Sequence, residues 1–285
     1  MTAVHLTAQV HSVQRAGAYQ EITVLAPPIA QQARPGQFLT VAVGGSESAL
    51  LLRRSFAIAG VEEWGIPAGR VRFVVAVHGR GTAWLSRLRP GESVDVVGPL
   101  GRPFRLPKSP VGAVLVGGGY GSAPLIPLAD ALRVRAARID TILGAATRER
   151  LYAVEAARGV SHRLHVTTED GTAGSLGQVT DALEDVLEAG RTDVIYACGP
   201  MPMLAAVADI AEREGLPCQV SVEESMACGI GVCMTCVLPV RGSDGVTRMV
   251  RSCVDGPVFS GEAVRFADVG TVPPETLGAD AMLWH

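Results

Sequence analysis

The 285-residue sequence lacks any strong excess of charge: 25 Lys and Arg side chains stand against 28 Asp and Glu, for a formal net charge of −3 at pH 7. The charged residues are dispersed along the chain rather than gathered into runs. Because phosphate backbones are bound through basic patches, this composition argues against a nucleic-acid partner. Internal repeats and low-complexity stretches are also missing.

Long apolar runs are missing as well. Arg, Asp, Gly or Pro interrupts every window of about 18 apolar residues, and residues 1–17 show no charged stretch followed by an apolar core. We therefore expect a cytoplasmic protein without a membrane span. Cysteine is scarce, with six in the chain, and in a reducing compartment clustered cysteines more often hold metal or do redox chemistry than form disulfides.

Residues 1–105 consist of short β-type segments separated by turns. Alternating apolar positions, β-branched residues and breakers such as Pro35-Gly36 and Pro90-Gly91 favour a closed or nearly closed antiparallel barrel. One short helix is expected at 82–88. The six β-type segments are 6–14, 19–27, 37–44, 55–60, 70–77 and 92–101.

Residues 106–221 repeat a different pattern, in which an apolar strand is followed by a turn and a helix of about 12 residues. Continuous apolar strands alternating with helices indicate a parallel sheet covered on both faces, the doubly wound α/β fold of nucleotide-binding domains. The expected strands are 112–119, 139–147, 163–171, 192–199 and 217–223, and the expected helices are 123–137, 149–159, 176–190 and 200–215.

Residues 222–285 are rich in glycine and cysteine and hold too few apolar residues for a core of their own. Cys228, Cys233 and Cys236 have the spacing CxxxxCxxC, and Cys253 follows after a further 16 residues. Plant-type 2Fe-2S clusters have this spacing of ligands. The sequence therefore predicts a cluster held by four thiolates, which would also supply ordering energy that the segment lacks.

The alternatives for these cysteines are a structural zinc site or unrelated thiols. Gly229 and Gly231 let the loop fold tightly enough for backbone N–H groups to point at sulfur, which fits a cluster. Zinc sites prefer paired CxxC motifs, and only Cys233 and Cys236 form one here. We therefore expect iron rather than zinc.

Four glycines, Gly117, Gly118, Gly119 and Gly121, lie between the first strand and the first helix of the α/β domain. Bare backbone at such a turn lets a pyrophosphate approach the helix N-terminus, where unpaired N–H groups favour negative charge. Glycine also serves close packing, and the spacing is not the usual GxGxxG. The turn therefore predicts a dinucleotide site, with close packing as the alternative role of its glycines.

A second turn at the same sheet edge is Cys198-Gly199-Pro200, which ends the strand predicted at 192–199. Ligands of such folds bind at this edge, so Cys198 is expected near a bound nicotinamide. The alternative is a buried structural thiol, which is the interpretation we favour for Cys218.

The three parts, in this order, resemble the ferredoxin reductase superfamily and, within it, the electron-transfer subunits of class 1B dihydroorotate dehydrogenase. The likeness runs over nearly the whole chain. Its most specific parts are EESMACGIGVCMTCVLPV at 223–240, RSCVDGPVF at 251–259 and GGGYGSAPLIPLA at 117–129.

The resemblance implies an FAD site on the barrel. The family's flavin motif is similar to Arg54-Ser55-Phe56-Ala57, so Arg54 would pair with flavin phosphate and backbone from Phe56 to Ile58 would line the isoalloxazine. Without the family, a solvated charge at a strand end is the simpler interpretation of the arginine. Ala57 departs from the pattern, because the family usually has a hydroxyl close to the reactive flavin edge.

Two further loops resemble family elements. In GRGTAWL, Gly79, Gly81 and Thr82 would hold the FAD pyrophosphate at a helix start, and an N-cap role for Thr82 is compatible with this. In DGTAGSLGQVTD, Asp170 would come near the nicotinamide, or it could simply form the turn.

The resemblance implies a chain that passes electrons between NAD and a partner through FAD and the 2Fe-2S cluster, with no catalytic side chain of its own. The partner would be the FMN-containing catalytic subunit that oxidises dihydroorotate to orotate in pyrimidine biosynthesis, in a heterotetramer. One alternative is an NAD(P)H reductase that serves an oxygenase, a hydrogenase or a ferredoxin. Another is a redox-sensing or scaffold protein with structural zinc.

NADP remains open beside NAD. Arg148 and Arg150 follow the second strand of the α/β domain, where an arginine can meet a 2′-phosphate. Charged residues at a helix start are the alternative, and the resemblance favours NAD.

Overall fold

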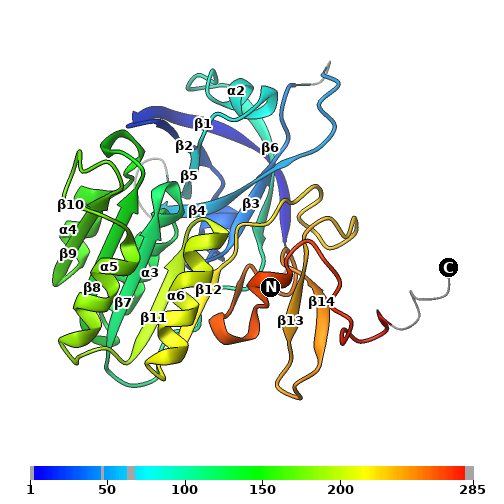
Figure 1. Ribbon diagram of the computed structural model, residues 1–285. Coiled ribbons are helices and arrows are strands. Elements are labelled where there is room, and N and C mark those ends of the chain that lie inside the picture. Colours follow the sequence, from blue (N-terminus) through cyan, green and yellow to red (C-terminus); the bar gives the residue numbers. More distant parts are fainter. Residues whose placement is uncertain (1–2, 46–47, 63–67, 280–285) are drawn as a thin grey trace.

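A computed structural model describes residues 3–45, 48–62 and 68–279. It consists of a closed barrel, a seven-stranded sheet covered by helices, and a two-stranded hairpin (Figure 1). The predicted fold class is confirmed. Among the described residues, no helix has both the length and the apolar character needed to cross a membrane.

The barrel has the strand order β1-β2-β5-β4-β3-β6, and all of its strand pairs are antiparallel. Its strands are β1 (Val4–Ala16), β2 (Tyr19–Leu25), β3 (Phe38–Val41), β4 (Arg54–Glu62), β5 (Arg70–Val75) and β6 (Ser93–Leu100). Inward-facing aliphatic residues and Phe73 fill the interior. Two short helices, α1 (Pro27–Ala30) and α2 (Arg80–Leu85), flank the barrel, and only the second was expected from the sequence.

The second part is a sheet in the order β10-β9-β8-β7-β11-β12-β15, parallel except where β12 meets β15. The strands are β7 (Val111–Gly118), β8 (Ala136–Ala145), β9 (Arg163–Thr168), β10 (Ser175–Leu176), β11 (Val194–Cys198), β12 (Cys218–Ser221) and β15 (Val258–Ser260). The central strands are the continuous apolar runs seen in the sequence, because both of their faces are covered.

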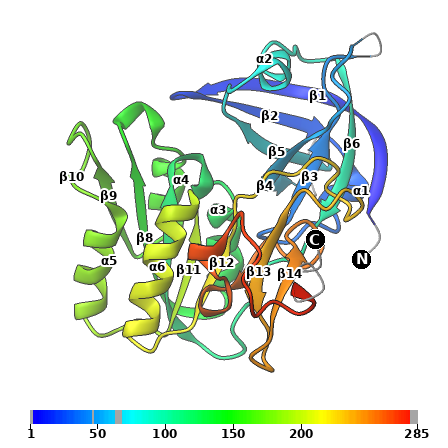
Figure 2. The same ribbon diagram turned by 45° about the vertical axis from the view of Figure 1, so that its right-hand side comes forward.

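Helices cover the two faces of this sheet, and β7 shows how. Val114 and Val116 pack into the core that includes α5 and α6, whereas Ala113 and Leu115 pack into the core that includes α3. The helices are α3 (Leu125–Leu132), α4 (Val154–Val160), α5 (Val179–Glu188) and α6 (Met201–Arg213). In both views α5 and α6 lie side by side (Figures 1 and 2).

All four helices of the α/β domain are shorter than the sequence predicts, and α3 and α4 show how their starts differ. The helix expected at 123–137 is preceded by a 3-10 turn, Gly119–Ser122, and ends at Leu132. The helix expected at 149–159 begins only at Val154, since Ala153 takes a left-handed conformation with φ of 61°. Just before it, the Tyr152 hydroxyl donates to Glu21 of the barrel. Contacts with the barrel thus override the local helical pattern.

The third part depends on the other two for its packing. Its hairpin pairs β13 (Val237–Arg241) with β14 (Thr247–Arg251), and β15 joins the α/β sheet across the predicted boundary at residues 221 and 222. Cys236 and Cys253 form a small apolar cluster with Phe38 and Leu100 of the barrel. The segment therefore borrows its core, as its composition suggested.

Candidate functional site

The carboxyl ends of β7 and β11 form the centre of the candidate site. From β7 the chain builds the sheet in one direction through β8, β9 and β10, and in the other through β11 and β12. Ligands of open α/β sheets bind where the strand order reverses in this way. Gly117 and Cys198 are register partners at that point, so the two turns predicted from the sequence lie together.

These two turns approach each other more closely than side chains would permit. A Cβ on Gly121 would lie 2.6 Å from the Gly199 Cα, and one on Gly118 would lie 2.9 Å from Pro200 Cδ. Gly117 has a different role, because its Cβ would meet Ser122 and Leu143 within the domain. The glycines thus serve both packing and the bare backbone that a pyrophosphate requires.

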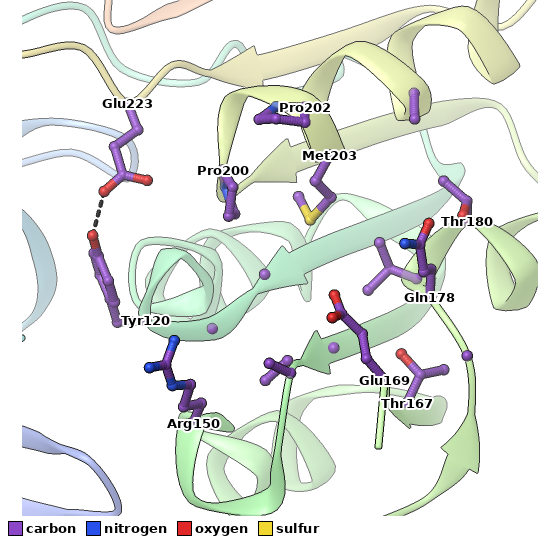
Figure 3. Close-up of a pocket in the computed structure, with 18 of the residues that line it drawn as sticks. Tyr120, Arg150, Thr167, Glu169, Gln178, Thr180, Pro200, Pro202, Met203 and Glu223 are labelled. Atoms are coloured by element: carbon purple, nitrogen blue, oxygen red, sulfur yellow. Dashed lines mark hydrogen bonds between the residues drawn. The ribbon is translucent and has the colours of Figure 1, made fainter. Parts of the chain in front are cut away.

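A cavity of about 390 Å³ lies over this edge of the sheet, and we call it the sheet cavity (Figure 3). Three of the residues predicted to bind a dinucleotide line this cavity, namely Gly118, Gly119 and Pro200. Its other lining residues are Tyr19, Tyr120, Gly144, Ala145, Ala146, Arg150, Thr167, Glu169, Gly177, Gln178, Val179, Thr180, Pro202, Met203, Ala206 and Glu223.

The predicted residue Asp170 lies outside this cavity. Its carboxylate accepts hydrogen bonds from the backbone N–H and the hydroxyl of Thr172, at 3.0 and 2.6 Å, which lowers the pKa of Asp170. This is the turn-forming role that the sequence left as an alternative. Glu169, which the sequence analysis missed, lines the cavity in its place.

A second cavity, of about 140 Å³, lies between the barrel and the sheet, and we call it the interdomain cavity. Ser55, Phe56 and Ala57 line it from β4, opposite the turns that end β7 and β11. Ile58, whose backbone was predicted with them, is not among the lining residues, and its side chain lies in the barrel core with 3% of the residue exposed. The remaining lining residues are Gly36, Phe38, Val74, Tyr120, Gly121, Ala123, Cys198, Gly199, Ser221, Val222, Glu223, Glu224, Met226 and Pro257.

Tyr120 and Glu223 are the two residues that line both cavities. The Tyr120 hydroxyl donates a hydrogen bond to the Glu223 carboxylate (Figure 3). The Tyr120 ring packs edge-on against Tyr19, with 5.4 Å between ring centroids. Burial, and then the hydrogen bond to Glu223, raise the pKa of Tyr120, so the hydroxyl remains a donor at neutral pH. This pair forms a partition that the sequence did not reveal.

Cys198 reaches the interdomain cavity with a protonated thiol. Burial raises its pKa to about 12, and only 8% of the residue is exposed. A thiol with such a pKa is a poor nucleophile at neutral pH. Cys198 is therefore suited to contact a bound ring rather than to form a covalent bond.

The two elements predicted to hold FAD phosphates meet at the start of α2. A Cβ on Gly81 would lie 3.0 Å from the Arg54 guanidinium, so this cation lies directly against the bare helix turn. The Thr82 hydroxyl accepts hydrogen bonds from the N–H groups of His78 and Gly79, at 3.0 and 3.1 Å. Gly79 is therefore the N-cap residue, and Thr82, at the third helical position, bonds back to it. Arg54 and the exposed Gly79 present a charge and open backbone fit for phosphate.

The four predicted ligand cysteines lie in and beside a tight loop on the barrel. Gly229 has φ of +72°, and a Cβ there would lie 2.5 Å from Thr40 Cγ2 of β3, so glycine is required for the loop to dock. Cys228 Sγ accepts backbone hydrogen bonds from Ile230 and Val232, both at 3.4 Å. Amides that point at sulfur favour a thiolate ligand.

The cysteines interact in two pairs. A hydrogen bond from the Thr235 hydroxyl, and then one with Cys228, lower the pKa of Cys233 to about 6. Burial, and then a hydrogen bond with Cys236, raise the pKa of Cys253 to about 12. Within the described residues no three His, Cys, Asp or Glu converge tightly enough for a single ion.

Comparisons with known proteins give one consistent result. Residues 223–265 match the family described as the iron-sulfur cluster binding domain of dihydroorotate dehydrogenase B. The electron transfer subunit of dihydroorotate dehydrogenase B (NAD(+)) from Bacillus caldolyticus is 40% identical over 249 residues, 86% of this chain and 92% of that protein. A probable subunit of the same description from Methanopyrus kandleri is 37% identical over 244 residues, 86% of each chain.

Solved structures agree on the fold. A chain from the structure of an NADH-dependent reduced ferredoxin-NADP oxidoreductase superposes with a TM-score of 0.80 and 31% identity, covering 96% of this chain and 95% of that one. The ferredoxin reductase of carbazole 1,9a-dioxygenase has a TM-score of 0.64 at 20% identity, over 76% of this chain and 68% of that one. The chain belongs to the family of dihydroorotate dehydrogenase B electron transfer subunits, within the ferredoxin reductase-like fold.

Proposed function

We propose that this chain transfers electrons between a dihydroorotate-oxidising partner and NAD, through a 2Fe-2S cluster and FAD. One observation carries the proposal: the interdomain cavity adjoins both of the other sites. It shares Tyr120 and Glu223 with the sheet cavity, and it shares Phe38 and Met226 with the apolar cluster around the buried cysteines. A flavin ring there would contact a nicotinamide on one side and neighbour the cluster on the other.

The FAD would be held by both faces of the interdomain cavity. Ser55, Phe56 and Ala57 offer strand backbone to the ring, and Cys198 offers a neutral thiol from the opposite side. Arg54 with the glycines Gly79 and Gly81 would receive the phosphates at the start of α2. Ala57 has no hydroxyl to donate to the flavin. The hydroxyl of Tyr120, which lines the same cavity, is a hydrogen-bond donor there.

NAD would lie in the sheet cavity, with its pyrophosphate on Gly118 and Gly119. Cys228, Cys233, Cys236 and Cys253 would ligate the irons. When bound, a flavin exchanges hydride with a nicotinamide and single electrons with an iron-sulfur centre. The protein's part is to orient the two rings, exclude water between them and keep the cluster close.

The partner would be an FMN-containing catalytic subunit, assembled with this chain as a heterotetramer. Around the exposed ligand Cys233, the loop displays the large apolar side chains Ile230, Val232 and Met234, with 52 to 75% of their surfaces exposed. Three exposed apolar side chains beside a cluster ligand suit a surface that contacts the partner subunit, across which electrons would pass. A reducing cytoplasm would keep the four cysteines free of disulfides and so able to ligate the irons.

Anaerobic preparation tests the proposal. The protein should carry FAD and about two irons per chain, and NADH should bleach the flavin absorbance. Dihydroorotate should reduce NAD⁺ only when the chain is purified together with the catalytic subunit. Colourless, iron-free protein, or dihydroorotate oxidation by the isolated chain, would contradict the proposal.

A ferredoxin-linked reductase is the second candidate, because the structure with 31% identity belongs to a ferredoxin-NADP oxidoreductase. Relatives at 37 to 40% identity carry the dihydroorotate dehydrogenase description instead. Measuring electron transfer from NADH to a ferredoxin and to the FMN-containing subunit, at equal concentrations, separates the two candidates.

A further inference from the structure

The sheet cavity has two chemically different ends. Tyr120 and Glu223 mark the end that meets the interdomain cavity, whereas Gln178 and Thr180 lie at the opposite end (Figure 3). A nicotinamide that reaches a flavin must occupy the first end. With the pyrophosphate on the glycine turn between them, the adenosine half must extend toward the second.

The charges in the cavity are divided between these ends. Arg150 lies on the Tyr120 side, and its backbone carbonyl accepts a hydrogen bond of 2.8 Å from Tyr19 of the barrel. Glu169 lies on the side of Gln178 (Figure 3). Arg150 is thus placed for the nicotinamide half of the dinucleotide, and the Glu169 carboxylate is placed for the adenosine half.

Glu169 directly follows β9, the third strand of the sheet along the chain. In the common dinucleotide-binding arrangement an acidic residue after the second strand binds the ribose 2′-hydroxyl. Here the second strand, β8, runs into Ala145 and Ala146 without a carboxylate. The Glu169 N–H donates to the Ala145 carbonyl at 3.1 Å, which fixes the acid beside the end of that strand.

The sequence offered two arginines for a 2′-phosphate. Arg150 lines the sheet cavity on its Tyr120 side, away from Gln178 (Figure 3), and Arg148 is otherwise engaged. Arg148 donates from Nε and Nη2 to the Thr172 carbonyl, at 2.9 and 2.6 Å, and it is not among the residues that line the sheet cavity. A 2′-phosphate would therefore meet Glu169 without a compensating cation from this residue.

We propose that Glu169 determines specificity for NAD over NADP, by accepting a hydrogen bond from the adenosine ribose 2′-hydroxyl and repelling a phosphate at that position. The inference rests on the proposed function, since it assumes that a dinucleotide occupies the sheet cavity. Glu169 is exposed to solvent, so the repulsion is screened. A doubly charged phosphate at about 4 Å from a carboxylate in water changes affinity by about ten- to thirtyfold.

The test measures the dissociation constants of NAD⁺ and NADP⁺ on flavin-loaded protein, from changes in flavin absorbance. Wild type should bind NAD⁺ at least about tenfold more tightly, with a preference that shrinks as ionic strength rises. Glu169→Gln should lower the ratio by about ten- to thirtyfold, mainly by tightening NADP⁺. Glu188→Gln, the same charge change at the exposed end of α5, is the matched control and should leave the ratio unchanged.

Each outcome has a distinct meaning. An unchanged ratio in Glu169→Gln, with NAD⁺ binding intact, overturns the role of Glu169 and leaves the proposed function standing. A wild-type preference for NADP⁺ also overturns the role of Glu169, and it replaces NAD with NADP in the proposed function while leaving the dinucleotide site in place. Flavin-loaded wild type that binds neither dinucleotide overturns the proposed function and the inference together.

Discussion

Replacing Tyr120 with phenylalanine should strengthen NAD⁺ binding. The partition of Tyr120 and Glu223 separates the two cavities, yet hydride transfer requires the nicotinamide and flavin rings in contact. Their hydrogen bond must therefore break for the nicotinamide to enter. Tyr120→Phe removes this bond and keeps the ring that packs against Tyr19.

The size of the effect follows from the bond that is lost. Glu223 is exposed to solvent, so the hydrogen bond contributes roughly 0.5–1.5 kcal/mol, the ordinary net range. If breaking the Tyr120–Glu223 hydrogen bond costs this amount, the fraction of wild-type molecules able to admit the nicotinamide is reduced by about two- to twelvefold. The apparent dissociation constant of NAD⁺ is raised by the same factor. Tyr120→Phe should recover that factor.

Titration of flavin-loaded protein with NAD⁺, followed by flavin absorbance, measures the effect. ADP-ribose, which lacks the nicotinamide, does not need the partition to open, and its affinity should be equal in wild type and Tyr120→Phe. Equal NAD⁺ affinities in the two proteins would refute the reasoning. Weaker binding of both ligands would show that the hydroxyl contacts the nucleotide instead.

Three further predictions concern the cysteines and the glycine turn. Cys233→Ser should reduce iron from about two per chain and abolish the cluster's absorbance, whereas Cys218→Ala, a buried thiol in the sheet, should retain iron. Gly121→Ala should destabilise the fold by about 1–3 kcal/mol in urea unfolding, because its Cβ would lie 2.6 Å from the Gly199 backbone; an unchanged midpoint would contradict this. Burial raises the pKa values of Cys198 and Cys218 to about 12. Above pH 9 the unfolded chain therefore loses protons that the folded chain keeps. The free energy of unfolding should fall by roughly 1 kcal/mol per pH unit for each thiol. A stability that stays flat between pH 9 and 10 would argue against these shifts.

Local patterns predicted the architecture well. Period-two alternation and turn residues indicated the barrel strands, and continuous apolar runs indicated a parallel sheet. The errors came where tertiary contacts compete with local preference. Tyr152 is an example, because its bond to Glu21 of the barrel accompanies the break in a helix that the sequence extends back to residue 149.

The candidate site was predicted in part. The glycine turn and the cysteine spacing were recognisable, because close backbone approach and metal ligation demand particular residue types at fixed intervals. Ser55 to Ala57 were predicted only through the family resemblance. Asp170 was predicted beside them, yet the structure places its side chain in a surface turn. Ile58 was predicted through its backbone, and its side chain lies in the barrel core. One residue along a strand or turn reverses the direction of a side chain, and sequence spacing alone does not decide that direction.

The sequence by itself determined the three-part order and the fold class, and it carries the prediction of four cysteine ligands, since these follow from periodicity and spacing along the chain. Only the tertiary structure decided that Tyr120 and Glu223 form one partition and that Glu169 faces the sheet cavity. Tyr120 and Glu223 are 103 residues apart, and nothing in the local pattern of either predicts the other. Their contact arises from the parallel packing of β7, β11 and β12, which brings the carboxyl ends of distant strands to one edge.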